Sequence, residues 1–278
     1  KINNYNQQLI ERVTAVGGVE AVGLSISIPP DRLDVSDSFS IEGKPWPAGS
    51  TEPFVPVVFI SPEYFTALGV PVIRGRSFNE TDKEGSPLVV IINQTLAERY
   101  FAHEDPIGRR FKTGGADRPA NPWTEIVGVV GDVKYSGLEA QSEPAYYMPL
   151  TQNMWGSSYL VLRTQTDPGS LFPAIRQQIW ELDKDIPIAN LSTMDQLLAD
   201  SVAVPRFRTF LLGVFGALAL VLASVGTYGV ISYSVTKRTH EIGIRMALGA
   251  RGRDAMMLVI RQGVAVALVG VLIGLGGG

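Results

Sequence analysis

A run of 28 consecutive uncharged residues constrains this chain more than any other feature of its sequence. Residues 209–236, TFLLGVFGALALVLASVGTYGVISYSVT, lie between Arg208 and Lys237. A helix that crosses the hydrocarbon core of a membrane needs about 20 mostly apolar residues. The alternative is a buried core helix, but such helices are usually shorter and carry charges on one side. The run therefore predicts a membrane span over about 209–235, whose last turns carry tyrosines suited to the membrane interface.

A second apolar run begins near Met256 and continues to Gly278, with Arg261 as its one charged residue. A long arginine side chain near the end of a span can extend to the lipid headgroups. The run predicts a second span over about 256–278. Since Lys1 is not a methionine and the last residues lie within this run, we expect the chain to be part of a longer protein.

The loop at 236–255 between these two spans is basic, with five basic and two acidic residues. Short basic loops remain in the cytoplasm, so residues 1–205 are predicted to lie on the opposite, extracytoplasmic side. Residues 1–208 carry 18 basic and 25 acidic side chains, a net charge of −7, whereas 209–278 carry 6 and 2, a net charge of +4. An acidic first part argues against nucleic-acid binding, which requires a basic surface.

The first 205 residues mix helical and strand patterns without a strict strand–helix alternation, which predicts an α+β extracytoplasmic domain followed by transmembrane helices. The middle, about 36–155, resembles an insertion between two similar helix–strand units. Helices are predicted over 3–16, 62–68, 94–101, 168–182 and 194–202, and strands over 19–28, 54–60, 88–92, 124–133, 159–164 and 186–191.

Helix starts are predicted from capping residues. Ser61, Asn93 and Asp167 each precede a helical pattern, and Thr193 with Gln196 has the spacing of a capping box. Pro205 is predicted to separate the helix that follows Thr193 from the first membrane span.

Catalytic chemistry finds little support in the sequence. The chain has no cysteine, only two histidines, and no GxxxxGK[ST] phosphate loop. Its adjacent carboxylates, Glu104–Asp105 and Asp183 with Asp185, lie in turn-like segments. We therefore predict no catalytic residue, no metal site and no cofactor bound by this segment.

Basic and aromatic side chains need no ligand to explain them. Basic residues between Arg74 and Lys112 alternate with acidic ones, which predicts surface ion pairs. Among the tryptophans, Trp180 is predicted to lie in the core, and Trp46 and Trp155 are better candidates for contact with a partner or a membrane.

The loop between the spans contains a short helical pattern. Glu241 and Arg245 are four residues apart in the favourable order, and Ile242 and Met246 lie on the opposite, apolar side. Periodicity alone leaves two interpretations open: a helix lying on the headgroups, or a helix that docks into a groove of a cytoplasmic partner.

This loop also carries a family resemblance. KRTHEIGIRMALGARGRD (237–254) resembles the signature of the FtsX/MacB-type permeases of ABC transporters. Four further segments resemble the MacB-like periplasmic core domain: YFTALGVPVIRGRSF (64–78), TLAERYFAHEDPIGRRF (95–111), TEIVGVVGDVKYSGL (124–138) and EPAYYMPLTQ (143–152). Departures are mild: Gly252 occupies a frequently basic position, and Thr239–His240 precede Glu241 where arginine is common.

The resemblance implies a division at about 205, with a core domain over 1–205 and an incomplete FtsX-like transmembrane domain over 206–278. The core domain would be a porter-like module with a second, inserted module. In this family the loop between the spans binds a cytoplasmic ATPase through a coupling helix. The positions carried over, with two neighbours that the helical pattern places beside them, are Arg238, Glu241, Ile242, Gly243, Arg245, Met246, Ala247 and Gly249.

The resemblance also implies partners and a location. It predicts a multi-pass protein of the bacterial inner membrane that works as a homodimer or pseudo-dimer. An ABC ATPase subunit or domain would bind ATP and Mg²⁺ and drive efflux or substrate release outside the cytoplasm. A periplasmic adaptor and an outer-membrane channel are further partners that the resemblance allows. The alternative is an FtsX-like regulator that activates an extracytoplasmic partner.

Overall fold

The structure of the protein is a computed structural model. It describes residues 2–30, 35–47, 51–114, 118, 120–135, 137, 141–153, 158–237, 239–240, 244 and 270. The chain divides into two compact units, Lys1–Val202 and Ala203–Gly278.

The first unit contains four helices and nine strands among its described residues, and a fifth helix begins in it. The helices are α1 (Ile2–Thr14), α2 (Tyr64–Leu68), α3 (Gln94–Tyr100), α4 (Pro168–Leu182) and α5 (Met194–Lys237). The strands are β1 (Val19–Ser25), β2 (Ser36–Ile41), β3 (Phe54–Ile60), β4 (Val72–Gly75), β5 (Val89–Asn93), β6 (Arg110–Thr113), β7 (Thr124–Val130), β8 (Tyr146–Pro149) and β9 (Tyr159–Thr164). This mixture confirms the predicted α+β class.

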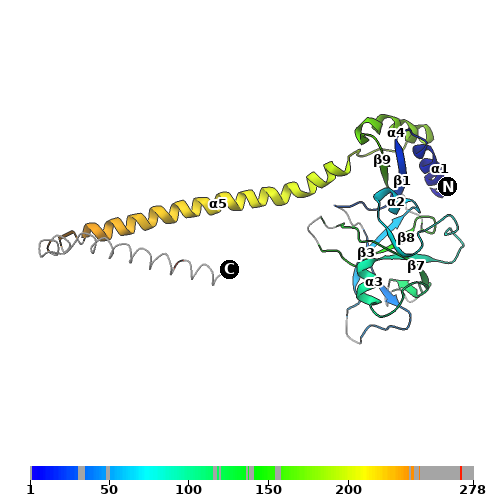
Figure 1. Cartoon of the computed structure of the whole chain (residues 1–278), viewed down its shortest axis with the longest axis horizontal. Helices are drawn as coiled ribbons and strands as arrows, with labels where there is room; N and C mark the ends of the chain where they lie inside the picture. Colours follow the sequence, from blue (N-terminus) through cyan, green and yellow to red (C-terminus); the bar gives the residue numbers. More distant parts are fainter. Residues whose placement is uncertain are drawn as a thin grey trace. The chain divides into compact units, whose positions relative to one another are not determined.

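The strands form one sheet in the order β2-β6-β7-β5-β8-β3-β1-β9. An additional pairing of β2 with β3 closes the first six strands into a ring, from which β1 and β9 continue outward. Strand β3 lies inside the range 36–155 and β1 lies outside it, and the two strands pair with Ser25 opposite Ile60. Figure 1 shows β1 and β9 beside α1 and α4, with α2, β3 and β7 further along the sheet. The domain boundaries and the inserted module stay predictions.

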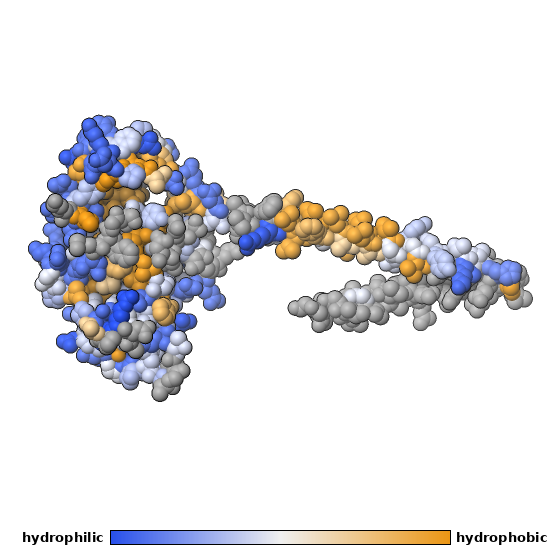
Figure 2. Space-filling view, turned by 180° about the vertical axis from the view of Figure 1, so that it is seen from behind, coloured by the Kyte–Doolittle hydropathy of each residue, from blue (hydrophilic) through white to orange (hydrophobic). Residues whose placement is uncertain are grey.

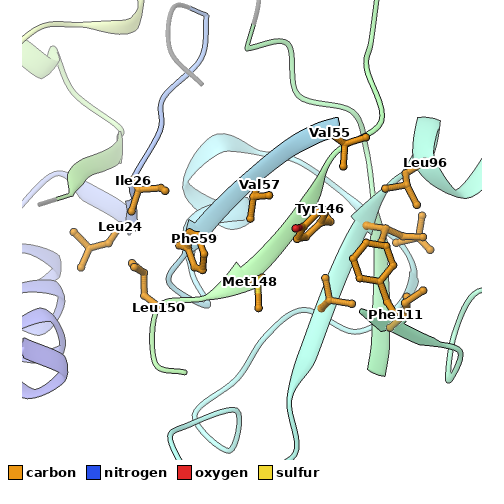
Figure 3. Packing of buried hydrophobic residues seen from close by; sticks show 14 of the residues in the cluster. Leu24, Ile26, Val55, Val57, Phe59, Leu96, Phe111, Tyr146, Met148 and Leu150 are labelled. Carbon is orange, nitrogen blue, oxygen red and sulfur yellow. The ribbon is translucent and has the colours of Figure 1, made fainter. Parts of the chain in front are cut away.

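Side chains that point into the ring form a continuous apolar core. Aromatic rings fill its centre: Phe39 stacks on Phe111 with ring centroids 4.9 Å apart, and Phe111 meets Tyr146 edge-on at the same distance. Figure 3 shows Val57, Phe59, Tyr146 and Met148 converging there from β3 and β8. Alternate side chains of β3 belong to different clusters, Val57 and Phe59 to this core and Val58 and Ile60 to a second one, as the period of a strand requires.

Helices cover both faces of the β1–β9 part of the sheet. Leu9 and Val13 of α1 and Ile175 and Ile179 of α4 belong to the same core as Leu24 of β1. On the opposite face, α2 packs against a second cluster that includes Val58 and Ile60 of β3. Gly23 of β1 permits this approach, because a Cβ there would lie 2.6 Å from the Cα of Tyr64.

Three helix starts follow the predicted capping chemistry. The Asn93 side chain accepts a hydrogen bond from Leu96 N at 3.0 Å, and Asp167 accepts one from Ser170 N at 3.1 Å. Thr193 and Gln196 form the predicted capping box: Thr193 N donates to Gln196 Oε1 at 3.0 Å, and Gln196 N donates to Thr193 Oγ1 at 3.2 Å.

The prediction that Ser61 caps a helix was wrong. Helix α2 begins after Glu63, which makes no side-chain cap. The Ser61 hydroxyl instead accepts a hydrogen bond from Leu24 N at 3.0 Å, across the sheet. The hydroxyl is therefore directed toward β1 rather than toward the first turn of α2.

Two predictions near the end of the first unit were also wrong. The segment 186–191 is not a strand, and Pro205 does not end a helix, since α5 continues from Met194 to Lys237. A proline removes one backbone hydrogen bond at a cost of about 3 kcal/mol, which a long helix with many remaining bonds can absorb. Four strands, β2, β4, β6 and β8, were not predicted. The last three are runs of four residues that carry too little periodicity, and β2, SDSFSI, contains few apolar residues.

Two tryptophans also lie elsewhere than predicted. Trp180 is 44% exposed rather than buried in the core. Trp46 is half-buried: its indole N–H donates to Phe39 O at 2.9 Å, and its ring packs edge-on against Phe39 and Tyr100. Trp155 lies outside the described residues.

Gly23→Ala is expected to destabilise the first unit. A methyl group at this position overlaps the backbone of α2, and overpacking of this kind costs about 1–3 kcal/mol. Such a loss lowers the melting temperature by about 2–4 °C per kcal/mol for a unit of this size. Gly17→Ala is the matched control, because its methyl group meets no atom within 4 Å. The melting temperatures are measured by tryptophan fluorescence. Equal values for the two variants would contradict the close packing of β1 against α2.

Candidate functional site

Helix α5 provides the described part of the candidate site. Within it, the segment Arg208–Tyr233 is 26 residues long, and its most apolar 18-residue window has a mean hydropathy of 2.2 and is not buried inside the protein. At 1.5 Å per residue this segment extends about 39 Å, more than the roughly 30 Å of hydrocarbon in a bilayer. Exposed apolar side chains lie on every side of the helix, Leu212, Leu220 and Leu222 each being more than 70% exposed. By length and composition this helix can cross a membrane.

The hydrophobic surface of this segment is unbroken in the view of Figure 2. Two hydroxyls of α5, one inside this segment and one just after it, donate to the backbone of the preceding turn. Ser224 Oγ donates to Leu220 O at 2.8 Å, and Thr236 Oγ1 donates to Ser232 O at 2.9 Å. These hydroxyls therefore need no external partner in an apolar surrounding.

The predicted coupling residues lie outside the described part of the chain. They are Arg238, Glu241, Ile242, Gly243, Arg245, Met246, Ala247 and Gly249, together with nearly all of the predicted second span at 256–278. Three residues between them are described: Thr239, His240 and Ile244 are helical, and Ile244 is 51% exposed. The roles of the predicted coupling residues therefore stay predictions.

No metal site was found among the described residues of either unit, where no three histidine or acidic side chains come together. The carboxylates considered as an acid–base pair serve turns instead. Asp105 accepts a hydrogen bond from Ile107 N at 3.1 Å, and Asp183 accepts one from Asp185 N at 2.9 Å. Geometry thus assigns these side chains to the local backbone.

The predicted ion pairs of the basic segment are present. Arg109 contacts Glu104 at 2.9 Å, and Arg110 lies 3.6 Å from Glu42. Lys44 also pairs with Glu104. The basic partners and Glu42 are largely exposed, so screening by water keeps the contribution of each pair to stability small.

The Arg76–Asp82 pair is built differently, because its carboxylate is buried. Arg76 Nη1 and Nη2 donate to the two Asp82 oxygens at 2.7 and 2.8 Å, and Asn79 N donates at 2.9 Å. Burial on its own would raise the pKa of Asp82, but these hydrogen bonds outweigh it and hold that pKa below its ordinary value of 3.8. The pair fastens the loop at 76–82 rather than forming a catalytic group.

Three buried tyrosines lie together in the second cluster, on the face of the sheet that α2 covers. The hydroxyls of Tyr64 and Tyr135 share a hydrogen bond at 3.0 Å, and Tyr147 lies in the same cluster. Burial raises the pKa of Tyr64 to about 12 and raises the pKa values of Tyr135 and Tyr147 as well. These phenols stay protonated at physiological pH and are unsuited to act as bases.

Family models match nearly the whole chain. A model of the MacB-like periplasmic core domain matches residues 4–182, and a model of the FtsX-like permease C-terminal region matches residues 213–278. Among curated relatives, "Macrolide export ATP-binding/permease protein MacB 1" of Yersinia pestis bv. Antiqua is 28% identical over 237 residues, covering 82% of this chain. The MacB protein of Wolinella succinogenes is 30% identical over 224 residues, or 74% of this chain. The chain spans 35% and 33% of the length of these two relatives.

Solved structures give matches of lower similarity. The periplasmic region of MacB from Actinobacillus actinomycetemcomitans matches with a TM-score of 0.43 at 18% identity, covering 66% of this chain and 73% of that one. The extracellular domain of the transporter YknZ matches with a TM-score of 0.42 at 18% identity, covering 64% and 82%.

Asp82→Asn is expected to lower the melting temperature at pH 7. The lost charge-assisted hydrogen bonds are worth about 1–2 kcal/mol, toward the lower end because Arg76 is 43% exposed and screened by water. Since the folded-state pKa of Asp82 is depressed, its contribution is present above its unfolded-state pKa of about 3.9 and is lost as the pH falls through the folded value. The difference between wild type and variant should therefore shrink below about pH 4. If the difference in melting temperature between wild type and variant stays constant from pH 7 to pH 3, the ionised Arg76–Asp82 pair is not its source.

Proposed function

The chain belongs to the MacB/FtsX family of ABC transporter permeases, and from this premise we propose that it couples ATP hydrolysis in the cytoplasm to movement of its first unit outside the cytoplasm. The observation that carries this proposal is the continuity of α5. The helix begins at the Thr193–Gln196 capping box of the first unit and ends at Lys237, where the KRTHEIGIR segment starts.

ATP and Mg²⁺ would be bound by an ABC ATPase, as a separate subunit or as a domain of the same polypeptide. The relatives are named as ATP-binding and permease proteins, and this chain matches about a third of their length. The chain itself lacks a GxxxxGK[ST] phosphate loop. We therefore assign it the permease role and no enzymatic site of its own.

The contact with the ATPase would be made by the loop at 236–255. Glu241 and Arg245 can pair along one side of a short helix, which leaves Ile242 and Met246 free to enter an apolar groove of the partner. Movement of that groove would then act on the span that ends at Lys237. A difference in affinity between the ATP-bound and ATP-free partner is required for any shift in the conformation of the permease.

Location follows from the same charges. The basic loop at 236–255 would lie in the cytoplasm, α5 would cross the bacterial inner membrane, and the first unit would lie outside the cytoplasm. Such a permease would act in efflux or substrate release as a homodimer or pseudo-dimer, with an adaptor and an outer-membrane channel as further partners. The match to an FtsX-like model supports one alternative, a regulator of an extracytoplasmic partner. Substrate-dependent export distinguishes the two.

Photo-cross-linking in the full-length protein tests the ATPase contact. A photoreactive amino acid at Met246 is expected to trap an ABC ATPase in cells, or an ATPase domain of the same chain. The matched control is Leu222, a residue of the apolar segment that is 71% exposed and should trap lipid.

A pair of charge reversals sharpens this test. Arg245→Glu should lower the Met246 adduct at least about tenfold, the effect of about 1.4 kcal/mol on binding. Arg253→Glu, which changes the charge of the loop equally, should leave the adduct unaltered. Lipid adducts alone at Met246 in a correctly inserted protein would contradict ATPase coupling and support an interfacial helix.

A further inference from the structure

Helix α5 contains a proline, Pro205, before its apolar segment. Proline has no backbone N–H, so the carbonyl of Ser201 lacks the donor that an α-helix normally supplies four residues later. A proline ring also clashes with the carbonyl four residues before it, which opens the turn. In addition, the Ser201 hydroxyl donates to Leu198 O at 2.8 Å and competes there with the backbone. The turn at 201–205 is therefore weaker than the turns around it.

This turn lies at the boundary between the two compact units, which falls after Val202. Before the boundary, Leu197, Leu198 and Ser201 are half-buried and share one side of the helix. After it, the side chains from Arg208 to Gly226 are exposed. The first two turns of α5 thus belong to the first unit, and the apolar segment begins about 10 Å beyond Ser201 along the helix, at 1.5 Å per residue.

Glycines inside the apolar segment are the other places where α5 can bend. Gly213 with Gly216, and Gly226 with Gly229, are three residues apart. A sharp bend breaks backbone hydrogen bonds, and hydrocarbon offers no replacement donor or acceptor. The turn at 201–205 precedes the apolar segment, so water can donate to the free carbonyl of Ser201 there. Bending of α5 is therefore less costly at the proline than at the glycines.

We propose that the turn at 201–205 is a hinge, about which the first unit tilts relative to the span that follows. This inference rests on the proposed function, in which α5 crosses the membrane and ATP binding moves the first unit. Hinges are short segments that absorb the backbone change of a larger movement, while the elements on either side keep their structure. With a hinge here, the first unit can change its orientation without an equal tilt of the whole span within the bilayer.

A distance distribution between two spin labels in one chain tests the hinge without nucleotide. Arg99→Cys on α3 and Leu222→Cys in the span are exposed positions that precede and follow the turn in the chain. Residues 1–278 contain no cysteine, so the labelled full-length protein would carry these two alone in a background without other cysteines. It would be diluted with unlabelled protein and measured in lipid nanodiscs. Pro205→Ala restores the missing donor and should narrow the distribution about twofold.

The matched control is Pro173→Ala, the same substitution at an exposed position inside another helix, α4. This variant should leave the width of the distribution unaltered. A distribution equally wide in wild type and Pro205→Ala would overturn the hinge, and so would equal narrowing by both proline substitutions.

Amide hydrogen exchange measures the turn itself. In the full-length protein, Pro205→Ala should slow the exchange of the amides at 202–204 at least about tenfold, because a turn with all its hydrogen bonds opens less often. Pro173→Ala should not change the exchange of these amides. Identical rates at 202–204 in wild type and Pro205→Ala would show that the proline does not weaken this turn, which contradicts the proposal.

ATP separates the hinge from the proposed function. With ATP bound to a partner ATPase that cannot hydrolyse it, the wild-type distribution should shift, and Pro205→Ala should lose most of this shift. A narrower distribution in the variant without nucleotide, together with no ATP-dependent shift in wild type, would support the hinge and contradict coupling. An ATP-dependent shift of equal size in wild type and variant would overturn the hinge and leave coupling intact.

Discussion

The surface of α5 between Arg208 and Tyr233 is apolar, as the hydrocarbon core of a membrane requires. The rest of the architecture depends on this property. Large apolar side chains on all sides of the helix are exposed, and each would cost about 1.5–3 kcal/mol to leave in water. Between Arg208 and Tyr233 the chain is helical throughout and contains no proline, so its backbone groups can pair within the helix, as an apolar solvent requires. In the proposed function this segment crosses the membrane, with the polar first unit on one side and the basic loop on the other.

The first unit, which precedes this helix in the chain, is a layered α+β domain. Six strands close into a ring around a shared aromatic core, and β1 and β9 extend the sheet between α2 on one face and α1 and α4 on the other. Helix α5 begins close after this layered part, at a capping box in which two backbone amides are satisfied by side chains. Capping of this kind stabilises the first turn of the helix.

Local chemistry allowed much of the fold to be predicted from the sequence. Asn93, Asp167 and the Thr193–Gln196 pair cap their helices as predicted, because each capping interaction involves residues only three apart. The errors arose where distant residues decide. Ser61 is engaged by Leu24 from another strand, and β8 is recognisable only through its pairing with β3 and β5. The segment 186–191 has the pattern of a strand, but a strand also needs a neighbour. The coupling residues came from a sequence motif, and they lie outside the described residues.

Distance measurements between spin labels test the central claim of coupling most directly. Gln177→Cys is exposed on α4 and introduces a single cysteine into residues 1–278. Labelled full-length protein in lipid nanodiscs would be measured without nucleotide and with ATP bound to a partner ATPase that cannot hydrolyse it. Coupling predicts that the distance distribution between the labels of two copies shifts when ATP binds. Identical distributions in the two states, with ATP binding verified, would contradict the account.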